Sequence, residues 1–479
     1  MARTKKTPRE KSEPLIWNYD FSGTSSELIG DAGISESALT DLSARLLTAH
    51  QQVQTMRSRK VLGFLDLTSE QTRLKNMATE IRRAKECDNF VQIGSSGSLL
   101  GSKGICSALL HPGHNALSKK DRNGFPRIFF LDSPEPLQLR SLLNQIDLGK
   151  TLFHFVSKTG ESADTLATLS YIYRKVEKKK GAKKAARQFI ISTDPKRGTL
   201  FEISEEKGFT LLPIPTSIGA RFSTLSVPGL FPASVGGIRT TRLLEGAQAM
   251  DQLCLSDDWR INPALKGAAY QYLMSTTHET LTQLLALSTA SLGDIGFWYR
   301  HLWTESLCKS IDRSGNAATS GQAVAILSGP RDLIGNVQLL MEGPRSQMTT
   351  FVTFDEIQDD IGVPSTFEDQ ADLHIMKGCT FSTLLPQVQA IEIGMQREHR
   401  PYCTLRLPRL DEFHLGALIH LFHLQTAYIA ELFNINAYDQ PSAELIKGYG
   451  RALLSAKNKQ RETENSHRQR IHEDSLSAV

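Results

Sequence analysis

The chain has 479 residues, of which 40% are hydrophobic and 22% are charged, and this length is sufficient for two substantial hydrophobic cores. Its net charge of +4 is too small to indicate a general affinity for nucleic acid, although it is compatible with a local positive pocket for a small anion. The six cysteines form no CxxC pair and have no histidine partners at metal-ligand spacing, which argues against a metal site and a secreted disulfide framework.

The two ends of the chain carry few apolar residues. Residues 1–14 are basic and polar, contain no apolar signal-peptide core and are expected to be disordered. No internal segment reaches the length of a membrane span, because the apolar run from Leu225 to Ile238 is broken by Pro228 and Pro232. We therefore expect a cytoplasmic protein with neither a membrane nor a nucleic acid as its partner.

Short runs of strand-forming residues alternate with helical segments along the first half of the chain. Strands are expected at Phe90–Ile93, Arg127–Leu131, Leu152–Val156, Gln188–Ser192 and Phe209–Ile214. The clearest helix between them runs from Ser162 to about Glu177. This alternation predicts a mostly parallel sheet with helices on both faces.

The second half repeats this pattern. Helices are expected at Ala268–Thr289, Gly296–Lys309, after Arg331 and at Leu415–Phe433, and strands at Ala323–Leu327, Thr349–Phe354 and Tyr402–Leu407. The predicted fold class is α/β, with two α/β/α sandwich domains, mostly parallel sheets and a helical arm at the C-terminus. We place the first domain at residues 15–245, the second at 246–435, and the arm and tail at 436–479.

Two predicted strand-to-helix junctions are rich in glycine and hydroxyl groups. The first spans Val91–Gly101 and the second spans Phe155–Thr165. Backbone N–H groups at the start of each following helix, together with hydroxyl groups and one lysine, could bind a phosphate monoester. The simpler alternative is that these hydroxyl groups only cap helices, but two such loops in one domain favour phosphate. The candidate side chains are Ser98, Ser157, Lys158, Thr159 and Ser162.

Five motifs resemble those of the glucose-6-phosphate isomerase family, in the family's order, over roughly residues 85–455. Ser96–Gly101 and Ser157–Thr165 resemble the SIS-type sugar-isomerase loops GGSxLG and SKTxTTxET. Ser217–Ser223 resembles VGGRFS, Thr304–Lys309 resembles ESLGK, and Tyr438–Lys447 resembles FDQxGVExGK. The ordered set is far more specific than any single motif.

The resemblance implies two SIS-type domains and the interconversion of glucose 6-phosphate and fructose 6-phosphate, with no metal and no cofactor. It implies that Gly97 and the five candidate side chains above hold the phosphate, and that Glu305 moves a proton between C2 and C1. Arg221 corresponds to the arginine that stabilises the enediolate, and Lys447 and Gln440 to further active-site residues. The chemistry agrees, since the reaction needs a carboxylate base and a fixed positive charge beside the developing oxyanion.

Three positions depart from the family pattern. Ile334 stands where the family carries a histidine that assists ring opening from the neighbouring subunit, and isoleucine cannot transfer a proton. Ala220 replaces the second glycine of GGR, and His301 replaces a glutamine. His301 is four residues before Glu305 and therefore shares its helix face, so it could replace the missing histidine or only orient the base. Lys447, His374 and His423 are other candidates for ring opening.

Two other functions remain open at this point, and a third is disfavoured. One is an isomerase for another aldose phosphate, such as mannose 6-phosphate. Another is a regulatory protein that binds a sugar phosphate but is catalytically impaired, which Ile334 favours and the retained Glu305 and Arg221 oppose. The third, a glucosamine-forming amidotransferase, requires an N-terminal cysteine where this chain has Ala2. The resemblance also implies a homodimer.

Overall fold

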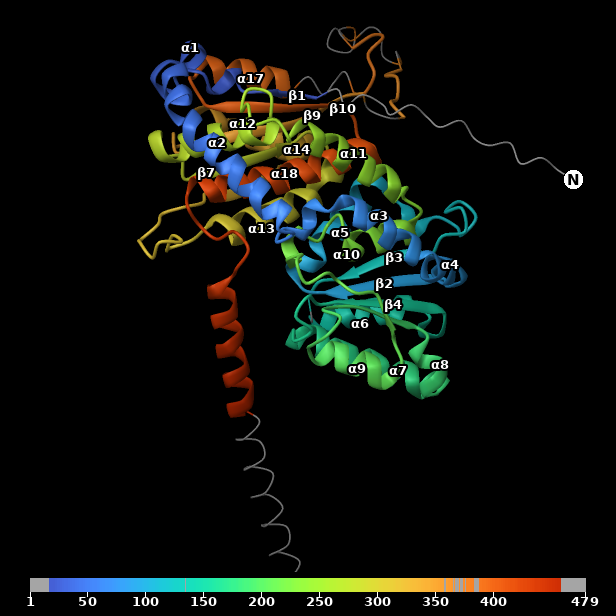
Figure 1. The fold of residues 1–479 in the computed structure, drawn as a ribbon. Helices are drawn as coiled ribbons and strands as arrows, with labels where there is room; N and C mark the ends of the chain where they lie inside the picture. Colours follow the sequence, from blue (N-terminus) through green and yellow to red (C-terminus); the bar gives the residue numbers. More distant parts are fainter. Residues whose placement is uncertain are drawn as a thin grey trace, which may run out of the picture.

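The computed structural model describes residues 17–457, except residues 134, 357–358, 365, 367–369, 371–373, 375 and 383–386. The basic segment 1–14 and the end of the tail lie outside these residues. The predicted α/β class is confirmed: the described chain forms two five-stranded, mostly parallel sheets with helices packed on their faces (Figure 1).

The first sheet contains all five strands expected in the first half of the chain, and each neighbouring pair is parallel. They are β2 (Asn89–Gly94), β3 (Arg127–Leu131), β4 (Thr151–Val156), β5 (Phe189–Ser192) and β6 (Thr210–Leu211). Their spatial order is β3-β2-β4-β5-β6. The direction of strand addition therefore reverses beside β2, and ligands bind at such a switch point, outside the carboxyl ends of the strands. The two hydroxyl-rich loops follow β2 and β4, which are neighbours there.

Helices cover both faces of this sheet, and side chains alternate between two cores. Phe153 and Phe155 of β4 belong to an outer core with α7, whereas Leu152 belongs to a core shared with the second sheet. The helices of this part are α4 (Ala78–Glu86), α5 (Leu100–Leu109), α6 (Pro136–Gln145), α7 (Ala163–Lys180), α8 (Ala182–Ala186), α9 (Thr199–Lys207) and α10 (Val227–Gly236).

The second sheet has the order β1-β10-β9-β7-β8. Its strands are β1 (Asn18–Asp20), β7 (Thr282–Leu287), β8 (Ala323–Ser328), β9 (Gln347–Glu356) and β10 (Tyr402–Arg409). All pairs are parallel except that of β1 with β10, which is antiparallel. Because β1 pairs with β10, the start of the segment 15–245 contributes a strand to the second sheet.

The expectation of one helix over Ala268–Thr289 is wrong. α12 (Pro263–Thr277) ends before Glu279, whose φ of 51° lies in the left-handed region that a helix cannot continue through. The following run Leu284–Leu287 lies in β7. Leucine and alanine favour helices, but this run is buried on both faces of the sheet, and continuous apolar runs are typical of central parallel strands.

The remaining helices pack mostly around the second sheet. They are α1 (Ser26–Ile29), α2 (Glu36–Ser58), α3 (Leu67–Asn76), α11 (Thr240–Leu253), α13 (Gly293–Leu307), α14 (Gly329–Gly335), α15 (Val337–Glu342), α17 (Gln387–Arg397) and α18 (Glu412–Leu432). From Phe413 to Leu432 every residue of α18 is buried, as expected for a helix that is apolar on all sides.

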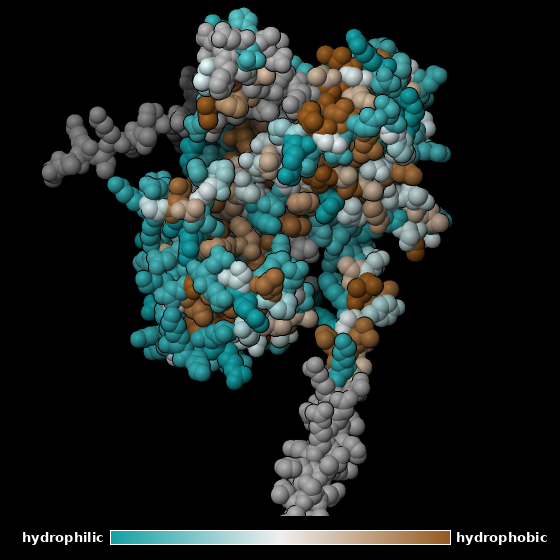
Figure 2. Space-filling view, turned by 180° about the vertical axis from the view of Figure 1, so that it is seen from behind, coloured by the Kyte–Doolittle hydropathy of each residue, from teal (hydrophilic) through white to brown (hydrophobic). Residues whose placement is uncertain are grey.

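The helical arm expected at the C-terminus begins at residue 441 and is described to residue 457. It projects away from the body (Figure 1) and displays apolar side chains (Figure 2). The exposed large apolar residues on it are Leu445, Ile446, Tyr449, Leu453 and Leu454. In the part of the chain that the structure describes, no helix is both long and apolar enough to cross a membrane.

A buried ionic cluster joins three helices. Asp251 of α11 accepts hydrogen bonds at 2.8 and 2.5 Å from the guanidinium of Arg57 on α2. Its Oδ1 also lies 3.0 Å from Nε2 of His420 on α18. Burial alone would raise the pKa of Asp251, but the hydrogen bonds from Arg57 and His420 outweigh it, so the pKa lies well below its ordinary value of 3.8.

Asp251→Asn should therefore destabilise the fold by about 3 kcal/mol at pH 7, since it leaves a largely buried arginine without its counter-ion. Because the folded-state pKa is depressed, the stabilisation is present above the unfolded value near 3.8 and is lost as the pH falls towards the folded value. Thermal unfolding followed from pH 7 to pH 2.5 should show the gap between wild type and variant narrowing below pH 4. The exposed Asp31→Asn serves as the control, and a gap that is independent of pH would contradict this account.

Candidate active site

The centre of the candidate site is an ion pair between the two halves of the chain. Nη1 of Arg221 lies 2.6 Å from Oε2 of Glu305 and 3.0 Å from Oε1 of Gln440. Nη2 donates to the backbone carbonyl groups of Ala437 and Asp439, at 2.9 and 3.2 Å. The Arg221 side chain is only 6% exposed, whereas that of Glu305 is 28% exposed. The guanidinium is thus fixed in place, and the carboxylate remains open to solvent.

Two short elements place this pair. Arg221 lies in the 3-10 turn η7 (Ala220–Phe222), and Glu305 lies in the last turn of α13. Trp298, two turns earlier on α13, donates its indole N–H to the backbone carbonyl of Arg221 at 3.2 Å. The helix that carries the carboxylate therefore also holds the backbone of the arginine.

Glycines of the first hydroxyl-rich loop allow this loop to approach the pair. A Cβ atom on Gly97 would lie 3.0 Å from Nε2 of His301 and 3.4 Å from Cγ of Arg221. One turn along α5, a Cβ atom on Gly101 would overlap the side chain of Thr224. A side chain at Gly101 would not fit, and one at Gly97 would displace its neighbours slightly. The two glycines therefore allow the loop after β2 to lie against the Arg221 segment.

His301 lies beside the base. Its Nε2 is 3.5 Å from Oε2 of Glu305, and its side chain is 17% exposed. Burial lowers the pKa of His301 below its ordinary value of 6.5; Glu305 acts in the opposite direction, while Arg221 and Arg300 lower the pKa further. The imidazole is therefore neutral at pH 7 and can accept a proton.

The two loops meet at the switch point with their helix ends uncapped. Oγ of Ser162 lies 3.4 Å from Oγ of Ser95. Ser162 occupies the N-cap position of α7 and Leu99 that of α5, but neither side chain caps its helix. The alternative that these hydroxyl groups serve only as caps is thus not supported at Ser162. Both N-termini retain backbone donors for an anion.

The other expected phosphate residues are distributed around these loops. Ser98 and Ser157 are buried. Oγ1 of Thr159 lies 3.4 Å from the backbone N–H of Glu161, which donates to it. Lys158 donates from its ammonium group to the carbonyl of Pro215 at 2.6 Å, and burial lowers its pKa. Its charge therefore lies against the segment that leads to Arg221.

Lys447 lies apart from the pair in this structure. Its Nζ is 2.8 Å from Oε1 of Glu444, and its side chain is 46% exposed. Gln440, by contrast, contacts Arg221 directly. The structure thus brings Gly97, Arg221, His301, Glu305 and Gln440 together and leaves Lys447 on an exposed helix.

The other ring-opening candidates lie elsewhere. The ring of His423 is enclosed by Phe222 and Trp298, each with its centroid 5.3 Å away. Burial lowers its pKa well below the ordinary value. His374 is exposed in the connection between β9 and α17, and Ile334 is 51% exposed on α14. Neither His423 nor His374 is therefore placed beside the Glu305 carboxylate.

Sequence reasoning did not select two features of the site. Ser95 faces Ser162 across the switch point, and its place within Gly94-Ser-Ser-Gly97 was the available signal. The second is Lys309, one turn after Glu305 in the sequence, whose Nζ lies 2.8 Å from Oδ1 of Asp439. That ion pair fixes the segment whose carbonyl groups hold Arg221.

Two solved structures share this fold. The hypothetical protein TT0462 from Thermus thermophilus superposes with a TM-score of 0.80 at 28% identity, covering 92% of this chain and 100% of that chain. A glucose-6-phosphate isomerase from Chlamydia trachomatis superposes with a TM-score of 0.70 at 21% identity, covering 81% of this chain and 74% of that chain.

Sequence comparison identifies the family. The model of the family described as phosphoglucose isomerase matches residues 38–359. A glucose-6-phosphate isomerase of Rubrobacter xylanophilus is 31% identical over 418 residues, 86% of this chain and 93% of that protein. One of Carboxydothermus hydrogenoformans is 29% identical over 445 residues, 92% of this chain and 95% of that protein. The chain belongs to the phosphoglucose isomerase family, whose members are aldose–ketose isomerases.

Gly97→Ala should impair isomerase activity without unfolding the protein. The added methyl group would press on His301 and Arg221 and shift them slightly, and since reaction rates depend steeply on the position of catalytic groups, kcat/KM should fall by about tenfold. Steady-state kinetics and a thermal melt measure the two effects. Gly362→Ala is the matched control, because a Cβ atom there meets nothing within 4 Å. Unchanged kinetics in Gly97→Ala would show that this close approach does not matter.

Proposed function

We propose that this protein catalyses the reversible interconversion of glucose 6-phosphate and fructose 6-phosphate through an enediol intermediate. The observation that carries the proposal is the 2.6 Å pair of Arg221 and Glu305, placed against the loop that contains Gly97. It supplies a carboxylate and a fixed positive charge beside a set of anion-binding donors.

In this proposal the phosphate occupies the switch point of the first sheet. Hydroxyl groups of Ser98, Ser157, Thr159 and Ser162 and the free N–H groups of α5 and α7 donate to it. Lys158 contributes positive charge, and its bond to Pro215 positions the chain before Arg221. Ser95 is an additional donor, because its hydroxyl lies next to that of Ser162.

The chemical step is a proton transfer between adjacent carbons. Glu305 removes the proton from C2 of the open-chain aldose as the C1 carbonyl oxygen gains a proton, which gives the enediol. Returning a proton to C1, with loss of the C2 hydroxyl proton, gives the ketose. Arg221 stabilises the negative charge that develops on oxygen, and Gln440 holds the guanidinium. Electrons stay within the substrate, so the step requires no redox cofactor.

Glu305→Gln should abolish turnover while sparing phosphate binding. The amide cannot accept the carbon-bound proton, and loss of a positioned base typically lowers the rate by about 10²- to 10⁴-fold. Proton NMR of each variant with glucose 6-phosphate or fructose 6-phosphate in heavy water reports both turnover and deuterium incorporation at C2 or C1.

Isothermal titration with a non-isomerisable six-carbon polyol phosphate serves as the binding control for the same variant. Retained deuterium exchange in Glu305→Gln would remove this residue from the mechanism. Binding without turnover by the wild-type protein would instead favour the impaired, regulatory alternative that Ile334 suggests. Turnover of mannose 6-phosphate in the same assay would favour the alternative of an isomerase for another aldose phosphate.

His301 is the second residue to which we assign chemistry, as the group that assists opening of the sugar ring. Its neutral imidazole lies 3.5 Å from the base, and the histidine expected from the family is replaced by Ile334. The competing role is orientation of Glu305 alone. Lys447 stays a prediction as an active-site residue, since its ammonium group pairs with Glu444.

His301→Gln separates these two roles. If His301 assists ring opening, kcat with the cyclic sugar phosphate should fall by about 10²-fold or more, while deuterium exchange into the open-chain fraction continues. If His301 only orients Glu305, both rates should fall together. Stopped-flow detection of the open-chain carbonyl, combined with the NMR assay, measures the two rates. If neither rate changes, both roles of His301 are excluded.

In this proposal the enzyme acts in glycolysis and gluconeogenesis, in the cytoplasm. It functions as a homodimer. Exposed apolar side chains on the second half of the molecule support a dimer: they include Phe297, Ile311, Ile334 and Leu339. The substrate partner is a sugar phosphate, with no role for nucleic acid or a membrane.

A further inference from the structure

The second phosphate loop contains a carboxylate. Glu161 lies between Thr159 and Ser162, within the segment that we propose binds a phosphate monoester. At neutral pH that ligand is close to a dianion, and a negative side chain in its loop opposes binding through direct repulsion. A cation close to Glu161, in addition to Lys158 of the same loop, would offset this repulsion.

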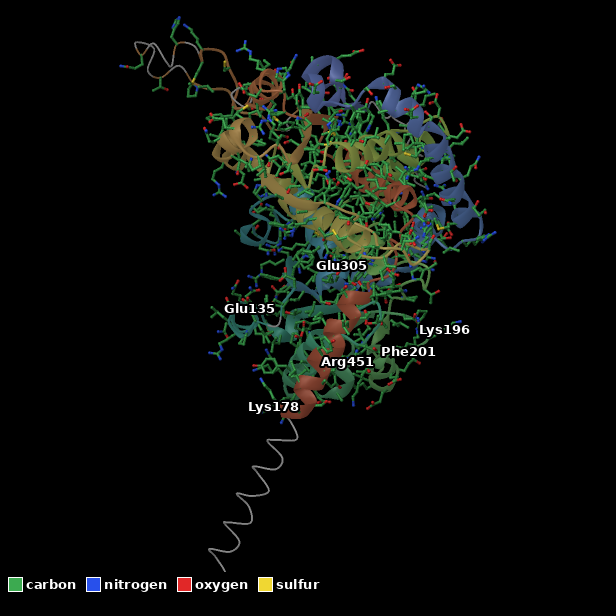
Figure 3. All side chains as sticks on the ribbon, turned by 90° about the vertical axis from the view of Figure 1, so that its left-hand side faces the viewer. Glu135, Lys178, Lys196, Phe201, Glu305 and Arg451 are labelled. Carbon is green, nitrogen blue, oxygen red and sulfur yellow. The ribbon has the colours of Figure 1, made fainter. Side chains whose placement is uncertain are left out.

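The C-terminal helix supplies this cation. Nη2 of Arg451 lies 3.1 Å from Oε2 of Glu161 and 3.4 Å from its backbone carbonyl oxygen. Figure 3 shows Arg451 on the helix that runs past the first sheet, with Glu305 labelled above it. The guanidinium thus contacts both the side chain and the main chain of the loop.

Arg451 belongs to a charged face of this helix. Glu444, Lys447 and Arg451 are spaced at three and four residues and share one face. The apolar Leu445, Tyr449 and Leu453 are spaced at four residues on another face and are exposed. Of this face, Arg451 contacts the loop through its pair with Glu161, whereas Glu444 and Lys447 pair with each other.

We propose that Arg451 is a ligand of the substrate phosphoryl group, and that Glu161 holds its guanidinium at the loop while the loop is empty. This inference rests on the proposed function. When the phosphate binds, it replaces Glu161 as the ion-pair partner of the Arg451 guanidinium. The helix of residues 441–457 then forms one wall of the phosphate site.

The relative strengths of the two pairings favour this exchange. Both side chains are about half exposed, 55% for Arg451 and 52% for Glu161, and exposed ion pairs contribute little. A guanidinium can instead bind a phosphate through two parallel charge-assisted hydrogen bonds, which are considerably stronger. Since Arg451 already touches the main chain of the loop, only a side-chain rearrangement is needed.

The alternative is that the pair simply fastens the helix to the first domain. The two accounts predict different changes in substrate affinity when Glu161 is replaced. If the pair is only a fastening, removing either partner should weaken substrate binding equally. If Arg451 binds phosphate and Glu161 competes for it, Arg451→Gln should weaken binding and Glu161→Gln should strengthen it.

The experiment measures KM for fructose 6-phosphate and inhibition by inorganic phosphate in wild type, Arg451→Gln and Glu161→Gln. Arg451→Gln should raise KM and the phosphate inhibition constant about tenfold with kcat within about twofold. Glu161→Gln should lower both constants severalfold. Lys457→Gln on the same helix is the charge-matched control, and thermal melts verify folding.

Changes in the same direction for both variants, or no change in Arg451→Gln, would overturn the assignment of Arg451 as a phosphate ligand. Either result in an active wild-type enzyme leaves the proposed function intact. A wild-type protein that turns over neither sugar phosphate would instead remove the proposed function itself.

Discussion

The buried guanidinium of Arg221 is the constraint on which the site depends. A charge that is almost fully removed from water is tolerated when a counter-charge and hydrogen-bond acceptors surround it. Here the partners come from different parts of the chain: Glu305 from the end of α13, and Gln440 with two carbonyl groups from the segment after α18. These contacts occupy both Nη groups of Arg221, while its Nε has no partner among the described residues. They bring the two halves of the molecule together and place a carboxylate, 28% exposed, beside the loop that contains Gly97.

Packing explains why the loops meet this pair. The first sheet places the segments after β2 and β4 side by side at its switch point. Gly97 and Gly101 then let the loop and helix after β2 approach Arg221 and Thr224 without side-chain overlap. A single hydrophobic core reaches from the inner face of the first sheet to that of the second. In the proposed reaction, this scaffold keeps the phosphate loops and Glu305 at a fixed separation, as proton transfer at the far end of a phosphorylated chain requires.

Local patterns predicted much of this architecture. Short apolar runs gave the five strands of the first sheet, and ordered motifs gave the residues that surround Glu305. Features set by distant contacts were not predictable: β1 joins β10 almost 400 residues later, and β7 is a strand because both its faces are buried, although Leu and Ala favour helices. Sequence likewise could not reveal that Lys158 faces Pro215 or that Arg451 reaches Glu161. These choices depend on which backbone or side-chain group the completed fold places nearby.

The central claim is that one ligand spans the phosphate loops and the Arg221–Glu305 pair. A crystal structure of the protein with an open-chain six-carbon polyol phosphate tests it most directly. We predict phosphate density at the Ser157–Ser162 loop, with C1 and C2 beside the Glu305 carboxylate and their hydroxyl groups within hydrogen-bond reach of it or of Arg221. Phosphate bound elsewhere, or a carbon chain directed away from Glu305, would contradict the account.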